Sequence, residues 1–170
     1  MSRAEALMTI PVGVIIERRK AKSAWADFVW RPVAVLPGVP DALPWTALGG
    51  TTECMNFYAG ESEIELYRAD TLGYRDNLAT DKPLLWVALR PIGAEPPYEI
   101  AAITAEPSEG EAFNETATNL VEAMPMPDSI RSAIAAFVAK HHFEHPFVKR
   151  QRDRTDPEAM ARRTPIKDRP

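Results

Sequence analysis

The sequence predicts one α+β domain, in which a curved antiparallel sheet of about six strands is packed by a C-terminal helix and a shorter helix. Three observations support this fold class. The chain is divided into short segments by 16 Pro and 8 Gly, several segments are rich in β-branched and aromatic residues, and one apolar stripe has helical spacing. With 45% hydrophobic residues, a chain of 170 residues can bury one core without metal or disulfide support. The sequence leaves open whether the sheet closes into a barrel.

The first two predicted strands form a hairpin. Residues 12–16 are mostly apolar and β-branched, and residues 27–36 alternate so that Phe28 and Trp30 share one side. The polar stretch between the two segments suits the turn. Residues 37–50 begin with Pro37 and Gly38 and predict a loop that folds back on the sheet.

The middle of the chain is predicted to form short antiparallel elements. We expect a second hairpin, with strands at 54–58 and 62–67 and a turn at Gly60, because Ile64 and Leu66 alternate with polar neighbours. Residues 71–78 have helical spacing but are few, so we expect a single helical turn. Strands at 84–90 and 98–105 are joined by a turn at Pro96 and Pro97, and such short links favour antiparallel pairing.

Two helices are predicted in the last third of the chain. Ser108 and Glu111 match a capping box, and a short apolar repeat follows them at helical spacing: Phe113, Ala117 and Leu120. The second helix is expected from about Pro127 to His142, with Pro146 as a stop signal. Its apolar stripe is expected to pack against the sheet and consists of Ile130, Ala133, Ile134, Phe137 and Val138.

Three regions are expected along the chain: an N-terminal extension at 1–9, the domain at 10–150, and a basic flexible tail at 151–170. Residues 149–170 contain eight Lys or Arg and four acidic residues, a net charge of +4, so the other 148 residues carry −8. The tail lacks apolar periodicity and therefore buries too little surface to offset the entropy of ordering it. It is first interpreted as a solvated tail; docking on an acidic protein, or contact with nucleic acid or anionic lipid, are the alternatives.

The histidines are the candidates for a metal site. His141 and His145 are one helical turn apart and could share a metal with Glu144. Cationic side chains are also favoured at a helix C-terminus, so we interpret them as helix-ending residues and expect neither a resident metal nor another cofactor.

No catalytic residue is predicted from the motifs. The single Cys54 lies in an apolar strand, where a buried thiol is expected. The sequence contains neither a serine-nucleophile elbow nor a glycine-rich phosphate loop.

A partner-binding surface is predicted at the first hairpin, from Arg18, Arg19, Trp25, Trp30 and Arg31. A core strand does not need arginines, and burying them unpaired would be costly, so we expect them at the surface near the tryptophans or paired with acids. Arg and Trp are enriched in the hot spots of protein interfaces. The cluster therefore favours contact with a protein or an anionic ligand.

Several motifs lie together between residues 10 and 150: Ile10-Pro11-Val12-Gly13-Val14, Glu17-Arg18-Arg19 with Trp25, the run 30–38, Tyr74 with Asn77-Leu78, Pro125-Met126-Pro127, and Phe137 with the run 141–150. In combination they resemble the bacterial family called domain of unknown function 3305. The resemblance implies a gene context beside molybdenum-dependent formate dehydrogenase and its maturation genes. It carries over no catalytic residue.

These features favour a non-enzymatic accessory protein that acts by protein–protein contact. From the resemblance, the expected partner is a formate dehydrogenase subunit or its maturation factor. A single cysteine fits a reducing, cytoplasmic location, and no stretch approaches the ~20 apolar residues that span a bilayer. The alternatives are a small enzyme of the same pathway, and a nucleic-acid-binding regulator acting through the tail, although no aromatic residues are interleaved with its charges.

Overall fold

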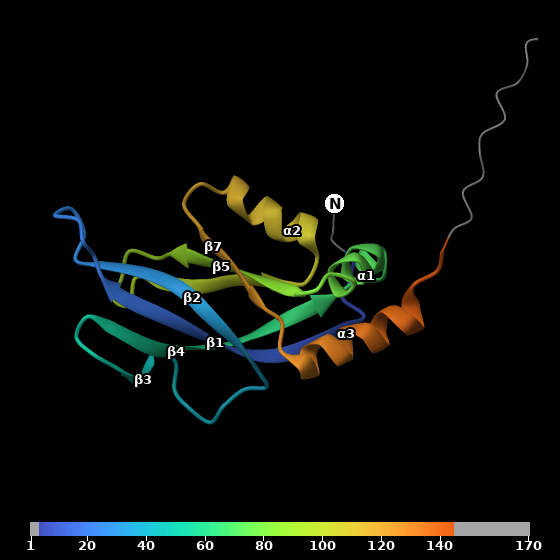
Figure 1. Cartoon of the computed structure of the whole chain (residues 1–170), viewed down its shortest axis with the longest axis horizontal. Coiled ribbons are helices and arrows are strands. Elements are labelled where there is room, and N and C mark those ends of the chain that lie inside the picture. Colours follow the sequence, from blue (N-terminus) through green and yellow to red (C-terminus); the bar gives the residue numbers. More distant parts are fainter. Residues whose placement is uncertain (1–3, 145–170) are drawn as a thin grey trace, which may run out of the picture.

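The computed structural model describes residues 4–144, which form seven strands and three α-helices (Figure 1). The strands are β1 (Met8–Lys20), β2 (Phe28–Pro37), β3 (Thr46–Gly50), β4 (Cys54–Leu66), β5 (Leu84–Pro91), β6 (Tyr98–Thr104) and β7 (Leu120–Pro125). The α-helices are α1 (Thr71–Leu78), α2 (Pro107–Ala112) and α3 (Asp128–His141), with short 3-10 turns at Arg68–Asp70 and Phe113–Glu115. No helix in this described part is long and apolar enough to cross a membrane.

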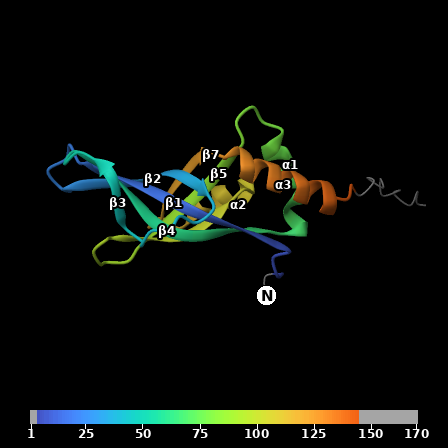
Figure 2. The same cartoon turned by 90° about the horizontal axis from the view of Figure 1, so that it is seen from below.

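The strands form two antiparallel sheets, which confirms the α+β fold class. The four-stranded sheet has the order β2-β1-β4-β3, and the three-stranded sheet has the order β6-β5-β7. The two sheets approach each other, with β4 beside β6 and β2 beside β7, but they remain separate and do not close into a barrel. Figures 1 and 2 show the β1–β2 hairpin at one end of the long axis, and α1 with the C-terminal end of α3 at the other.

One apolar core lies between the sheets and α3. It contains the inward rows of the strands, such as Val12, Val14 and Ile16 on β1, each of them fully buried. From α3 it receives Ile130, Ile134 and Phe137, so the predicted stripe does pack against the sheets. Burial of this apolar area is the main favourable term in the stability of the domain.

The first strand is longer than predicted. β1 runs from Met8 to Lys20 because β2 pairs with one of its edges and β4 with the other, which satisfies the backbone of its charged end as well as its apolar middle. Its start at Met8 also brings residues 8 and 9, predicted as part of an extension, into the sheet.

The predicted hairpin at Gly60 is wrong, since β4 continues through this glycine as one strand. Gly60 has a φ of 135°, a value that side chains disfavour, and the β1–β4 register shifts beside it. Glycine here therefore produces a bulge, which bends a strand without ending it.

Two strands were predicted as other structures. β3 lies inside the predicted loop, and β7 begins at Leu120, where a helical repeat was expected. α2 ends early because the chain turns through a 3-10 turn into β7, which pairs with β5. Its N-cap is Glu106 and not Ser108: the Glu106 carboxylate accepts a hydrogen bond from the Glu109 N–H at 2.7 Å.

The α-helices pack against one another and against the three-stranded sheet. α3 begins after Pro127, as predicted, and packs beside α1. α2 packs on β5 and β6, where Gly110 lies so close to the Trp86 ring that an added Cβ would be 2.3 Å from it. Pro146, His145 and the tail at 151–170 lie outside the described residues.

Candidate functional site

The alternation of β1 divides the predicted hairpin cluster between two faces. Residues 12, 14, 16 and 18 follow one another on the inward face, so Arg18 extends the row that ends in buried Ile16. Glu17 and Arg19 point to the opposite face. On the neighbouring strand Trp30 pairs with Arg18, and Arg31 pairs with Glu17. The arginines therefore belong to two different environments.

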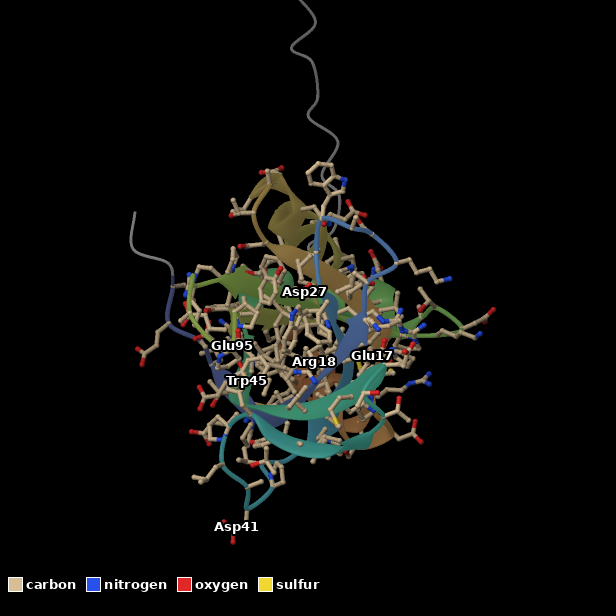
Figure 3. The ribbon with its side chains drawn as sticks, turned by 90° about the vertical axis from the view of Figure 1, so that its left-hand side faces the viewer. Glu17, Arg18, Asp27, Asp41, Trp45 and Glu95 are labelled. Carbon is tan, nitrogen blue, oxygen red and sulfur yellow. The ribbon has the colours of Figure 1, made fainter. Side chains whose placement is uncertain are left out.

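Arg18 lies among aromatic rings at the hairpin end of the space between the sheets (Figure 3). Its guanidinium carbon is 4.4 Å from the centroid of Phe28, 5.2 Å from that of Phe57 and 5.8 Å from that of Trp30. Such distances are those of cation–π contacts. We call Arg18, Phe28, Trp30, Trp45, Phe57 and Tyr98 the arginine–aromatic cluster.

The rings of the cluster also pack on one another. The Trp30 ring meets Trp45 edge to face at 6.0 Å and lies 6.5 Å from Tyr98. Trp45 has a φ of 67°, which is rare for a bulky residue. This backbone strain is tolerated here while the ring is held against Trp30 and Phe57.

Arg18 is only partly satisfied within this cluster. Its Nε atom is buried and has no hydrogen-bond partner among the described residues. An N–H group that is shielded from water and has no acceptor loses its hydrogen bond to water without gaining another one, which costs free energy. Cation–π contacts offset part of that loss, so Arg18 combines a stable packing position with unused hydrogen-bonding capacity.

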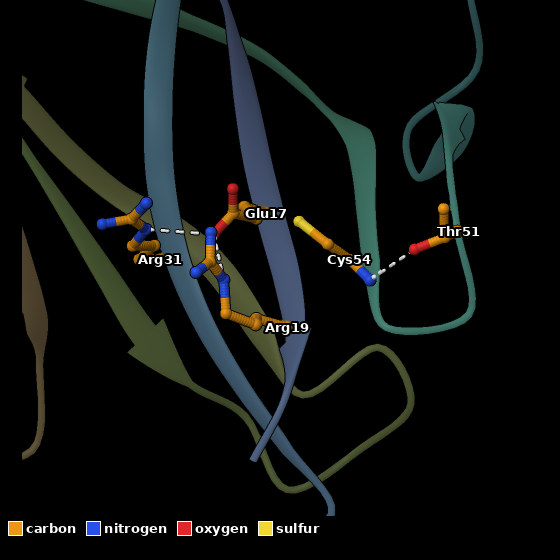
Figure 4. A network of polar contacts seen from close by, with 5 residues as sticks. All are labelled: Glu17, Arg19, Arg31, Thr51 and Cys54. Atoms are coloured by element: carbon orange, nitrogen blue, oxygen red, sulfur yellow. Dashed lines mark hydrogen bonds and ion pairs between the residues drawn. The ribbon is translucent and has the colours of Figure 1, made fainter. Parts of the chain in front are cut away.

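Glu17 organises an ion-pair network on the outer face (Figure 4). One carboxylate oxygen, Oε1, accepts hydrogen bonds from Nε of Arg19 and Nε of Arg31, each at 3.2 Å. Burial alone would raise the pKa of Glu17, but hydrogen bonds from the Cys54 thiol and Arg19, with the charge of Arg31, outweigh it and lower that pKa. Two of the predicted arginines therefore share one carboxylate of the chain, which leaves a net charge of +1 on the three side chains.

Trp25 is separate from both environments. It lies in the turn between β1 and β2 and is 97% exposed. Exposed Phe28 and Val29 follow it at the start of β2, so the hairpin end carries an apolar surface beside Arg19 and Arg31. The structure thus brings Arg18 and Trp30 together, joins Arg19 and Arg31 through Glu17, and leaves Trp25 projecting.

A pocket of about 1170 Å³ lies at the opposite end of the molecule, between the N-terminal segment, α1 and residues 141–144. In it His142 is 3.0 Å from the Thr71 hydroxyl through Nδ1 and 3.2 Å from Arg75 Nη1 through Nε2. Arg75 also donates to Glu144 at 2.8 Å. This pocket is therefore closed on one side by contacts between α1 and the end of α3.

The Thr71–His142 contact is not arranged as a nucleophile with its base. The Thr71 hydroxyl donates its one hydrogen to the Arg68 carbonyl at 3.1 Å, so Nδ1 of His142 must be the donor to Thr71. With Nδ1 as the donor to Thr71, Nε2 is the ring atom that faces the Arg75 guanidinium at 3.2 Å. The network fixes the chain after α3 and holds no free base at this hydroxyl.

The metal candidates are not brought together by what the structure describes. The His141 ring stacks at 4.5 Å on Phe137 of the same helix, and its proposed companion His145 lies outside residues 4–144. Within those residues no group of three or more His, Cys, Asp or Glu side chains is placed to hold a metal.

A smaller pocket of about 310 Å³ lies between β4 and β6 and is lined by acidic side chains. Glu65 accepts a hydrogen bond from the Tyr67 hydroxyl, and Glu109 accepts one from the Thr104 hydroxyl at 2.6 Å. The first contact lies at the C-terminal end of β4, and the second joins β6 to α2.

Comparison with known proteins decides the family. The family model described as protein of unknown function (DUF3305) matches residues 11–151, most of the chain. The chain belongs to the DUF3305 family. No curated protein and no solved structure matches it. The DUF3305 match covers the hairpin, the arginine–aromatic cluster and the α1–α3 contact, so all three belong to the family's domain.

Sequence reasoning missed part of the site in this DUF3305 domain. Phe57 and Trp45 join Trp30 and Arg18 although they lie on β4 and just before β3, and the prediction had treated residues 37–50 as a loop. The two-residue spacing of Phe28 and Trp30 opposite Arg18 places these three residues on one face, but no local signal links them to Phe57 or Trp45.

Proposed function

We propose that this protein is a non-enzymatic accessory protein that binds a partner through the end of its β1–β2 hairpin. The observation that carries the proposal is Trp25, a large aromatic side chain that is 97% exposed at the tip of a paired hairpin. The ring is almost fully in contact with water, so burying it in a partner would remove a large apolar surface from water.

The surroundings of Trp25 support the same conclusion. Phe28 and Val29 add exposed apolar area, while Arg19 and Arg31 lie at the surface with the Glu17 carboxylate between them. An apolar centre with arginines beside it has the composition of a protein interface. The two β-strands make this surface a preformed element, so little conformational entropy is lost on binding.

The partner that we propose is a subunit or maturation factor of a molybdenum-dependent formate dehydrogenase. This part of the proposal rests on the resemblance of the hairpin and helix motifs to the family and on the gene context that the resemblance implies. The accessory protein would hold or escort the partner during assembly, or remain bound as a small subunit.

Affinity purification from the native host tests the proposal. The tagged wild-type protein should retain a formate dehydrogenase subunit or maturation factor, identified by mass spectrometry, and Trp25→Ala should lose it. Leu72→Ala is the matched control, because Leu72 is also exposed but lies on α1 at the other end of the molecule (Figure 1). Retention of the same partner by Trp25→Ala would reject the hairpin surface, and its absence from the wild-type sample would reject the partner.

A further inference from the structure

Arg18 has no ion-pair partner in the described part of the chain, although the arginines around it do. Arg19 and Arg31 share Glu17 at 3.2 Å, and on the other sheet Arg90 pairs with Glu99 at 2.7 Å. The Arg18 guanidinium instead faces rings, and its Nε atom is buried without an acceptor. The partly buried Arg18 is thus left without an ion pair, whereas its more exposed neighbours Arg19 and Arg31 have one.

The acidic residues nearest to the hairpin end do not fill this role. Glu17, the sequence neighbour of Arg18, lies on the outer face of β1 and is engaged by Arg19 and Arg31. Asp27 and Glu95 are exposed at the same end of the molecule (Figure 3), and neither forms an ion pair with Arg18. Within the described residues the Arg18 guanidinium thus forms no ion pair, which leaves it open to a carboxylate from another molecule.

We propose that Arg18 is the receptor for an aspartate or glutamate side chain of the partner protein, which enters between the rings of the arginine–aromatic cluster. The inference rests on the proposed function for the existence of a partner and adds the chemistry of its contact. A carboxylate is the group that matches the forked donors of a guanidinium. Among aromatic side chains, with water excluded, this ion pair is stronger than at an open surface.

The surroundings favour an acidic side chain within a chain over a C-terminal carboxylate. Carboxylate termini are captured in proteins by successive backbone N–H groups. Here the donor is one side chain, Phe28 lies against it, and Trp25 and Val29 are exposed elsewhere on the same hairpin. We therefore expect the acidic residue to be flanked by apolar residues of the partner, which would cover these side chains.

Phe28 is the ring that can admit the carboxylate. It is the nearest ring to the guanidinium, at 4.4 Å, and it lies at the first position of β2 with 37% of its surface exposed. Rotation of this ring toward solvent would uncover the Arg18 Nε atom while Trp30 and Phe57 keep the guanidinium plane in position. Lysine could not replace Arg18, because it lacks the planar fork and the stacking surface.

An NMR titration tests the inference without the natural partner. The probe is the blocked tripeptide acetyl-leucyl-aspartyl-leucine amide, and the matched control has asparagine in place of aspartate. We expect the aspartyl probe to shift the Arg18 Nε–H resonance saturably, and the asparaginyl control to bind at least tenfold more weakly. Equal effects of the two peptides, or none, would overturn the inference. A third peptide, acetyl-leucyl-asparaginyl-leucine with a free C-terminal carboxylate, tests whether Arg18 binds a chain terminus. If this peptide binds more tightly than the aspartyl probe, the inference is also overturned.

Variants separate the receptor role from a structural role. Arg18→Met keeps the volume and removes the unpaired charge, so its Tm should equal or exceed that of wild type, while the aspartyl probe no longer binds. Arg18→Lys should also lose probe binding, and Arg90→Met on the other sheet should retain it. A fall in Tm for Arg18→Met beyond that of Arg90→Met would assign Arg18 to fold stability and contradict the inference. Failure of the wild-type protein to associate with the dehydrogenase, with probe binding intact, would reject only the proposed function.

Discussion

The side-chain amide of Asn77 and the backbone of Leu84 form a two-way hydrogen-bonded pair. Nδ2 of Asn77 donates to the Leu84 carbonyl at 2.8 Å, and the Leu84 N–H donates to Oδ1 at 3.0 Å. The second Nδ2 hydrogen reaches the Ala105 carbonyl at 2.8 Å. One buried side chain of α1 thus joins the start of β5 to the end of β6, and Asn77 is also part of the motif that resembles the family.

Asn77→Ala should lower the free energy of unfolding by about 3 kcal/mol, because it leaves two carbonyls and one N–H buried without partners. Urea denaturation followed by circular dichroism measures this change. Asn114→Ala is the control, since Asn114 is exposed in the 3-10 turn after α2 and should change stability by less than about 0.5 kcal/mol. A loss below about 1 kcal/mol for Asn77→Ala would mean that water replaces the amide.

Phe137→Ala should cost ~3 to 5 kcal/mol of stability, because the ring is buried between α1 and the sheets and packs edge to face on Tyr74 at 6.2 Å. Thermal and urea unfolding measure the loss. Leu72→Ala, at an exposed position of α1, should be close to neutral. Similar small effects of the two substitutions would show that α3 contributes little to the core.

Glu17 gives the stability a defined pH dependence. Its pKa is lower in the folded protein than its ordinary value of 4.5, so ionised Glu17 stabilises the fold above that pH, and the contribution is lost as the pH falls through the lowered value. At pH 7, Glu17→Gln should therefore be less stable than wild type by about 1 kcal/mol, a small figure because both arginines are solvent-exposed.

The difference between wild type and Glu17→Gln should disappear in acid, as unfolding curves from pH 7 downward would show. Glu53→Gln is the control, because Glu53 is exposed and its nearest cation, Lys20, is 4.0 Å away. A constant difference between wild type and Glu17→Gln at all pH values would show that packing of Glu17, and not its charge, is the cause.

The sequence predicted the elements whose signals are local. The apolar stripe of α3 and the strands β2, β5 and β6 follow from spacing and punctuation, and the structure confirms them. At 71–78 a single helical turn was expected, but α1 extends over all eight residues because it packs against α3. The failures have one physical origin, since they concern pairing between distant segments. Gly60 signals a turn locally but produces a bulge, because β1 continues to pair with β4 on both sides of it. β7 is a strand because β5 offers it an edge.

The candidate site was predictable in composition but not in arrangement. Arginines and tryptophans of the hairpin stand out in the sequence, yet their division between two faces depends on the pairing of Arg18 with Trp30 and of Glu17 with Arg31. The enclosure of Arg18 depends further on Phe57 of β4. A single sequence does not supply this long-range register, because each strand alternates correctly in more than one alignment.

The hairpin and the basic tail can be separated by their effects on formate dehydrogenase activity in the host. If partner contact is made by the β1–β2 hairpin, Trp25→Ala should lower activity nearly as much as deletion of the gene, because the exposed ring supplies apolar contact that no fold-stabilising role explains. Truncation of residues 151–170 should have the smaller effect. The fold of each variant is checked by its Tm. A larger loss on truncation would transfer the contact to the tail, and unchanged activity on gene deletion would remove the dehydrogenase from the proposal.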